Sequence, residues 1–146
     1  MEKEFINPQA LPNWEQSFTQ VITVSPTVPA KMVYISGQVA VDQDQNLIGE
    51  GDLAAQAVQA FRNLEIALAA GGATTADVVK INIYVKDYKP ENAAPVSEAL
   101  RRYFPRQQLP TSTWLGVQSL AREGFLIEVD AVAIVELGRS GDCGDK

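Results

Sequence analysis

Apolar positions along the chain follow two different periods, and each period predicts one type of secondary structure. Over residues 51–70, apolar side chains recur at the spacing of helical turns and are opposed by polar ones, which is typical of an amphipathic helix. Gly71 and Gly72 follow directly and are expected to end this helix. A second helix is expected over residues 92–103, because Pro105 cannot continue it.

Strand patterns account for most of the remaining chain. In residues 78–86, valine and isoleucine occupy alternate positions, which is the period of a strand. On this criterion and on the content of β-branched residues, strands are expected over residues 17–24, 31–41, 78–86, 111–118 and 125–136. Residues 1–17 are expected to form a lead-in loop, and residues 138–146 a flexible tail without pattern.

The order of these elements is β-β-α-β-α-β-β without internal repeats, which predicts a single α+β domain over residues 1–137. Each strand has one strongly apolar face and one mixed face. We expect two helices to cover the apolar face of an open, mixed sheet. The alternation places these large side chains on the mixed faces: Tyr34, Tyr84, Trp114, Leu126, Val132 and Ile134. Such a patch is typical of an oligomer interface, so we expect sheets to pack between subunits.

The composition excludes several kinds of protein. The chain has no histidine and a single cysteine, Cys143, which excludes histidine triads, histidine-ligated zinc and an internal disulfide. The net charge of −6 argues against nucleic acid as a partner, because phosphate binding needs concentrated positive charge. No apolar run approaches the ~18 residues of a membrane span, and the N-terminus lacks a signal-peptide pattern. We therefore expect a cytoplasmic protein with no membrane partner.

Two segments of the mixed faces are candidates for a binding site. Gly37 lies in the interior of a strand, where a glycine indicates either close approach of a ligand or a bulge or tight packing against a helix. In residues 111–118 the alternation places Ser112 and Trp114 on one side. An aromatic ring beside small polar residues is typical of a pocket wall, although tryptophan more often anchors a core or an interface.

Charged side chains supply two further candidates. Glu128 and Asp130 are two positions apart on a strand, so their carboxylates project from the same face at ~7 Å spacing. Such a pair can raise one pKa and supply a general acid, or it can form a solvated or arginine-paired edge. The cluster of Arg101, Arg102 and Arg106 can hold an anion or form a solvated helix end.

Taken together, these features resemble the RidA/YjgF/UK114 family of reactive intermediate deaminases, also called endoribonuclease L-PSP. The match extends in order through most of residues 15–136. Its segments are residues 33–38, Gln56, Asn63, residues 70–72, 77–80 and 84–87, Pro110 and residues 126–131. The resemblance implies a chorismate-mutase-like α+β subunit, with a mixed sheet of about six strands covered on one face by two helices. It also implies a homotrimer with a cleft between each pair of neighbouring subunits, and no cofactor or metal.

The resemblance also implies roles for particular residues. Glu128 matches the family's glutamate that positions water for hydrolysis of an imine, and Gly37 matches the glycine of the family's serine-glycine-glutamine segment. Phe18 stands in place of the family's cleft tyrosine, and Ser97 aligns with its cleft asparagine. Tyr84, on the mixed face, completes the substrate-binding residues that we expect beside the catalytic Glu128.

The family's substrate-binding arginine has no counterpart at the matching position. Where the family has Pro-Ala-Arg, this chain has Pro110, Thr111 and Ser112, and Trp114 stands where a small residue is common. A serine hydroxyl cannot neutralise a carboxylate, and loss of a bidentate guanidinium contact costs ~2–5 kcal/mol in a partly buried cleft. We therefore expect weak or absent 2-imino acid deamination, unless an arginine of the cluster described above reaches the cleft.

Three functions stay open on the sequence alone. The first is a divergent Rid-type hydrolase acting on a small imine, enamine or related carbonyl compound in the cleft, with Glu128 as the catalytic residue. The second is a non-catalytic trimer that binds or senses a small molecule. The third is a ribonuclease or translation inhibitor. A chain with no histidine and a net charge of −6 offers few acid–base groups for RNA cleavage and little positive charge for binding phosphate. The first is slightly favoured over the second.

Overall fold

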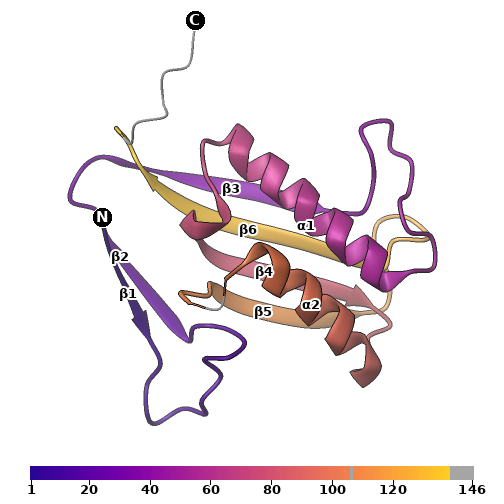
Figure 1. Ribbon diagram of the computed structural model, residues 1–146, viewed down its shortest axis with the longest axis horizontal. Coiled ribbons are helices and arrows are strands. Elements are labelled where there is room, and N and C mark those ends of the chain that lie inside the picture. Colours follow the sequence, from indigo (N-terminus) through magenta and orange to yellow (C-terminus); the bar gives the residue numbers. More distant parts are fainter. Residues whose placement is uncertain (106, 139–146) are drawn as a thin grey trace, which may run out of the picture.

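A computed structural model of the chain describes residues 1–105 and 107–138. The strands are β1 (Glu2–Ile6), β2 (Val21–Ser25), β3 (Ala30–Gln38), β4 (Val78–Lys86), β5 (Thr111–Val117) and β6 (Ile127–Glu136) (Figure 1). The helices are α1 (Leu53–Ala70) and α2 (Ala93–Tyr103), with short 3-10 turns η1 (Thr75–Asp77) and η2 (Pro90–Asn92). The tail expected over residues 138–146 lies outside the described residues beyond Gly138, and so does Arg106.

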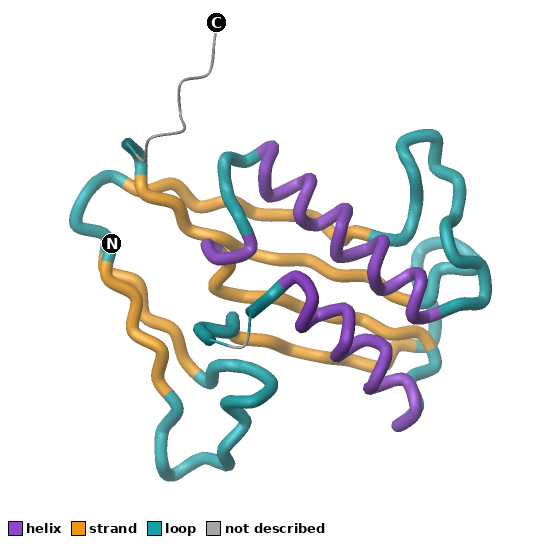
Figure 2. Tube along the Cα trace, viewed as in Figure 1, coloured by secondary structure: helices purple, strands orange, loops and turns teal. Residues whose placement is uncertain are grey.

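Four strands form a mixed sheet in the order β3-β6-β4-β5. β6 is antiparallel to both of its neighbours, whereas β4 and β5 are parallel. A parallel pair needs a crossover connection, and α2 provides it. Both helices lie on the same side of this sheet (Figure 2). The predicted fold class, two helices on one face of a mixed sheet, is therefore confirmed.

The two N-terminal strands form a separate hairpin, which stands apart from the four-stranded sheet (Figure 1). The expected lead-in loop is wrong for residues 2–6, which pair with β2 from Glu2↔Ser25 to Ile6↔Val21. The expected strand over residues 17–24 begins only at Val21. A five-residue strand with three charged side chains has too little apolar alternation to be recognised alone; its partner strand defines it.

The core lies between the helices and the apolar face of the sheet. The apolar stripe of α1, including Ala57, Phe61, Leu64 and Leu68, is at most 1% exposed. The helix begins at Asp52, whose carboxylate accepts a hydrogen bond from the backbone N–H of Ala55 at 3.1 Å. Its end at the two glycines is as predicted, with the second in the left-handed region at a φ of 73°. No helix in the described part of the chain is long and apolar enough to cross a membrane.

Two polar side chains of α1 hold the segment that follows β3 and the segment that leads into β6. Gln56 is fully buried and donates to the carbonyls of Gly49 (3.1 Å) and Gly124 (2.9 Å), while its Oε1 accepts from the N–H of Leu126 (2.9 Å). Asn63 donates to two carbonyls of the loop that follows β3, at 2.8 and 2.9 Å. These two residues therefore hold the end of β3 and the approach to β6, the strands that carry the candidate glycine and glutamate.

Candidate functional site

The predicted site residues lie on opposite faces of the four-stranded sheet. The parallel register pairs Ile81 with Ser112 and Ile83 with Trp114. Both isoleucines are fully buried under the helices, and residues paired across strands share a face. Ser112 and Trp114 therefore face the helices, and the expectation that Trp114 shares the mixed face with Tyr84 is wrong.

The error has a physical cause in the pattern of β5. Large apolar side chains occur on both sides of this strand, Trp114 on one and Leu115 on the other. Alternation shows which residues share a face, but only pairing with β4 shows which face points to the core.

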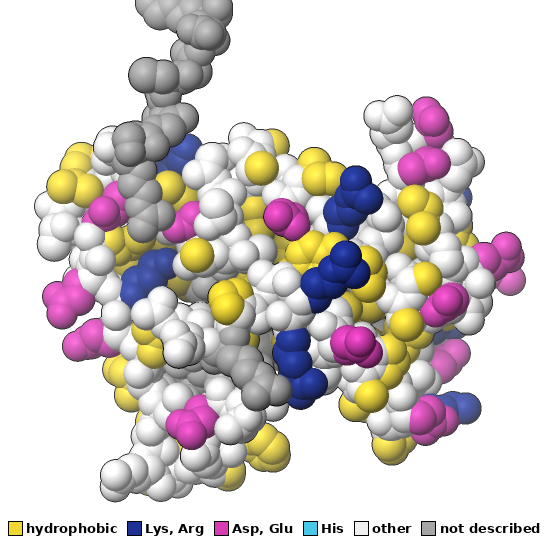
Figure 3. Space-filling model, viewed as in Figure 1, with side chains coloured by type: hydrophobic (Ala, Val, Ile, Leu, Met, Phe, Trp, Pro, Cys, Tyr) yellow, Lys and Arg dark blue, Asp and Glu magenta, His cyan; other side chains and the backbone are white. Residues whose placement is uncertain are grey.

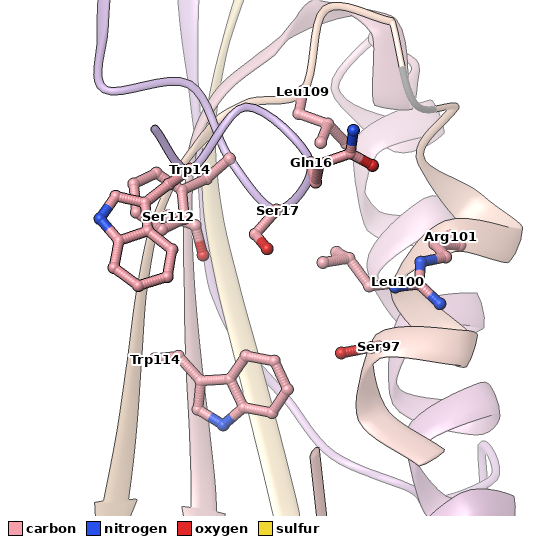
Figure 4. A pocket seen from close by; sticks show the side chains of 10 residues that line it. Trp14, Gln16, Ser17, Ser97, Leu100, Arg101, Leu109, Ser112 and Trp114 are labelled. Carbon is pink, nitrogen blue, oxygen red and sulfur yellow. The ribbon is translucent and has the colours of Figure 1, made fainter. Parts of the chain in front are cut away.

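On the helix side, a cavity of about 230 Å³ lies between β5, α2 and the segment that precedes β2 (Figure 4). Its apolar lining consists of Trp14, Phe18, Leu100, Leu109 and Trp114. Its polar lining consists of Gln16, Ser17, Ser97, Arg101 and Ser112. Four of the predicted or aligned cleft positions, Phe18, Ser97, Ser112 and Trp114, are thus brought together in this pocket.

Aromatic contacts and one anchor position the rings of the pocket. The rings of Trp14 and Phe18 stack with centroids 6.2 Å apart, and Trp114 meets Tyr88 edge to face at 5.8 Å. Thr19 is buried, and its hydroxyl donates a hydrogen bond to the backbone carbonyl of Leu109, just before β5, at 2.6 Å. This bond holds the N-terminal segment, with its two rings, against the β5 end of the pocket.

Of the two clustered arginines that the structure describes, Arg101 lines this pocket. Arg101 lies one helical turn after Ser97 on α2, so both side chains project from the same face of the helix. Figure 4 shows its guanidinium beside Leu100 on the pocket side of α2. Arg102 points elsewhere: it stacks over the ring of Tyr103 at 5.9 Å. Arg101 therefore brings a guanidinium to the pocket that Ser112 lines from β5.

The second group of predicted residues lies on the open face. Tyr84 is paired directly with Glu128 across β4 and β6. The register of β3 is irregular between Ile35 and Gln38, and Gly37 falls in this bulge. A Cβ built on Gly37 would overlap Oε1 of Glu128 and lie 2.6 Å from its Cδ. The carboxylate therefore rests against the bare backbone of the glycine.

The two neighbouring carboxylates of β6 have different surroundings. Asp130 accepts hydrogen bonds from Nδ2 of Asn82 at 2.8 Å and from the hydroxyl of Tyr84 at 3.1 Å. Burial raises the pKa of Tyr84, and the hydrogen bond to Asp130 and the charges of Asp130 and Glu128 add to this increase. Glu128 has no hydrogen-bond partner among the residues that the structure describes, so its oxygens are available to water or a ligand.

The pocket also contains residues that the sequence analysis missed. Trp14, Gln16 and Ser17 come from the segment interpreted as a lead-in loop. The available signal was Trp14 itself, because a large aromatic residue in a loop often marks a binding surface, and this one is 50% exposed.

Comparison with known proteins shows similarity through most of the chain. Residues 9–135 match the family described as endoribonuclease L-PSP. The human 2-iminobutanoate/2-iminopropanoate deaminase is 32% identical over 117 residues, covering 80% of this chain and 79% of that protein. The protein of the same name from Dermatophagoides farinae is 27% identical over 134 residues, covering 92% and 98% of the two chains. A solved Rid-family protein of unknown function from Yersinia pestis has a TM-score of 0.82 at 32% identity, covering 92% and 100%.

Proposed function

Because the chain belongs to the endoribonuclease L-PSP family, which includes the Rid proteins, we propose that it hydrolyses an imine or enamine at a site shared by two subunits. In this reaction water adds to the carbon of the C=N bond, and the nitrogen leaves as ammonia. A carbonyl compound remains. The curated relatives named above carry the names of deaminases of 2-imino acids, which is the same class of reaction.

The observation that carries this proposal is the division of the candidate residues between two faces of one sheet. The pocket with Ser112 and Trp114 opens on the helix side, whereas Glu128 and Gly37 lie on the opposite face. A four-stranded sheet separates them, so one chain cannot bring them to the same substrate. Contact between the pocket of one subunit and the open face of its neighbour completes the site.

The open face has the properties of a surface that a neighbour covers. Met32 is 55% exposed and Tyr34 is 71% exposed, and both lie on β3. Large apolar side chains that are exposed together are typical of an interface. A closed ring of three subunits gives each pocket one neighbouring open face, which is the arrangement that we propose.

The chemistry follows from the surroundings of the carboxylate. Glu128 accepts a proton from the water that attacks the imine carbon, and its free oxygens suit it to this task. Gly37 leaves the space that the carboxylate occupies. Hydroxyls of Ser97 and Ser112 donate hydrogen bonds to the polar end of the substrate. Ser112 does not neutralise a carboxylate, so binding of an anionic substrate such as 2-iminopropanoate depends on Arg101, which lines the same pocket from α2.

Complementation between two inactive variants tests the shared site. Glu128→Gln removes the proton acceptor, and Ser97→Phe fills the pocket. Each variant alone is expected to release no ammonia from a panel of imines and enamines generated in solution. Mixed subunits are expected to recover about a quarter of the wild-type rate, because random exchange unites an intact pocket with an intact Glu128 in that share of sites.

The controls separate the possible failures. Mass spectrometry of the mixture shows whether subunits have exchanged, and size-exclusion chromatography shows whether each variant keeps the oligomeric state of the wild-type protein. An exchanged mixture that stays inactive would contradict the shared site. If the wild-type protein binds a ligand but releases no ammonia, the proposed hydrolase activity is wrong and the non-catalytic binding function is supported.

A further inference from the structure

We propose that Arg101 makes the helix-side pocket a site for aromatic carboxylates, so that the favoured substrate carries an aryl side chain next to its carboxylate. The substrate role rests on the proposed function, whereas the binding preference does not require turnover. The inference comes from the charge, the lining and the size of one cavity.

The charge of the pocket selects an anion. Arg101 is the one charged side chain among the described residues that line this cavity, and none of these residues is acidic. It forms no ion pair or hydrogen bond with any residue that the structure describes. Basic side chains gather over α1 and α2 on this side of the molecule (Figure 3). A guanidinium presents two parallel donors, which match the two oxygens of a carboxylate.

Hydroxyl groups on both walls of the cavity add to this anion site. Ser97 lies on the same helical face as Arg101, and Ser112 projects from β5 across the cavity (Figure 4). Both hydroxyls can donate a hydrogen bond to a carboxylate or to the neighbouring nitrogen or oxygen. The polar end of a ligand therefore fits between α2 and β5.

The remaining lining selects a flat, apolar body. Trp14, Phe18 and Trp114 present aromatic rings, and Leu100 and Leu109 complete the wall. A small aliphatic acid such as propanoate would leave most of these rings without a contact, whereas an aryl group would stack on them.

The size of the cavity limits the ligand to a single ring or a little more. Its volume of about 230 Å³ lies below the ~300–1,000 Å³ of pockets that hold drug-sized molecules. A phenyl-substituted short-chain acid is therefore of suitable size for the part of the site that one chain forms.

Binding of 3-phenylpropanoate tests the inference directly. Both tryptophans of the chain line this cavity, so intrinsic tryptophan fluorescence reports on it alone, with calorimetry as a second measurement. Two comparison compounds separate the contributions: propanoate lacks the ring, and 3-phenylpropanamide lacks the charge. We expect 3-phenylpropanoate to bind at least about 10-fold more tightly than either. Equal affinity for the acid and its amide would overturn the role of the cation.

Two adjacent arginines provide a matched pair of variants. Arg101→Gln is expected to lower the affinity for 3-phenylpropanoate about 10-fold or more, and to leave the affinity for the amide unchanged. Arg102→Gln removes the same charge from a side chain that lies over Tyr103 outside this pocket, and is expected to change neither. Equal losses in the two variants would show that only the general positive charge of α2 matters, and would overturn the assignment of Arg101.

Turnover distinguishes this inference from the proposed function. Imines formed in solution from phenylalanine and from alanine by an amino-acid oxidase are compared in wild-type protein and Arg101→Gln. If the alanine-derived imine is hydrolysed faster and Arg101→Gln does not change the rates, the aryl preference is wrong and the proposed hydrolase activity is supported. Selective binding of 3-phenylpropanoate without hydrolysis of either imine would overturn the hydrolase and support the ligand class.

Discussion

The two faces of the four-stranded sheet carry candidate residues of opposite character. The helix-side pocket is aromatic, and Arg101 is its single cation among the residues that the structure describes; its walls come from three separate segments of the chain. The open-face group is anionic and lies on neighbouring strands, where Glu128 and Asp130 accompany Tyr84. In the function proposed above, the pocket of one subunit recognises the ligand, and the open face of its neighbour supplies the reacting carboxylate.

The two groups also differ in what holds them in place. Asp130 receives two hydrogen bonds from side chains of β4, and Gly37 lies in a bulge of β3, so strand register determines the open-face geometry. The pocket depends on the packing of α2 and the N-terminal segment against β5, with the hydrogen bond from Thr19 holding the N-terminal segment in place. Substitutions that act on one face alone therefore test whether the two groups of residues have separate roles.

The largest difference between the two faces is expected from a pair of glycine variants, one on each face: one variant lowers turnover and the other weakens ligand binding. In Gly37→Ala the new methyl group occupies the place of the Glu128 carboxylate. A displacement of about 1 Å lowers turnover about 100-fold, while 3-phenylpropanoate binding stays unchanged. In Gly116→Ala the methyl group comes within 2.8 Å of Cβ of Tyr88, which supports Trp114, so ligand binding is weakened instead.

Steady-state ammonia release and fluorescence titration measure these two effects, and thermal unfolding shows that both variants are folded. Loss of ligand binding in Gly37→Ala, to the same degree as in Gly116→Ala, would show that the two faces are not independent.

A smaller effect is expected when a second cation is placed in the pocket. Ser112→Arg restores a guanidinium at the strand position and is expected to raise the affinity for propanoate about 10-fold, because a charge-assisted bond replaces a neutral one. Some hydrolysis of 2-iminopropanoate is expected to return with it. Thr113→Arg adds the same charge to the opposite face of the same strand and is the control. A pocket without room beside Trp114 would show no gain in either measurement.

The smallest effect concerns the titration of Tyr84 on the open face. Its pKa is raised by burial and by its bond to Asp130, so folding favours the protonated phenol. The stability that results is complete below the ordinary tyrosine pKa of about 10 and is lost as the pH rises beyond it.

Asp130→Asn removes a negative charge and an acceptor, so the pKa of Tyr84 is expected to fall while remaining raised by burial. Absorbance of tyrosinate during alkaline titration measures the pKa, with Tyr84→Phe identifying the signal of this residue. The loss of stability above about pH 10 is also expected to be smaller in Asp130→Asn, because the pKa values of Tyr84 in the folded and unfolded states then lie closer together. An unchanged titration would show that Asp130 does not act on Tyr84.

Several features of the fold were predictable because their causes are local. The apolar stripe of α1 is a periodic pattern within one segment, and the glycines that end the helix act through their own backbone conformation. β1 had no such signal, since its short, charged segment becomes a strand only through pairing with β2. Among the site residues, sequence alone placed Glu128 and Tyr84 on one face, because adjacent alternating strands share that pattern, and the structure pairs them.

The residue pattern of this chain determined its helices, its central strands and the likeness to one family, because hydrophobic periodicity and matching motifs are written in consecutive residues. Tertiary structure decided which way β5 faces, that Arg101 rather than Arg102 reaches the pocket, and that Trp14 joins it. These outcomes depend on strand register and on the packing of distant segments, where a shift of one residue turns every side chain to the opposite face.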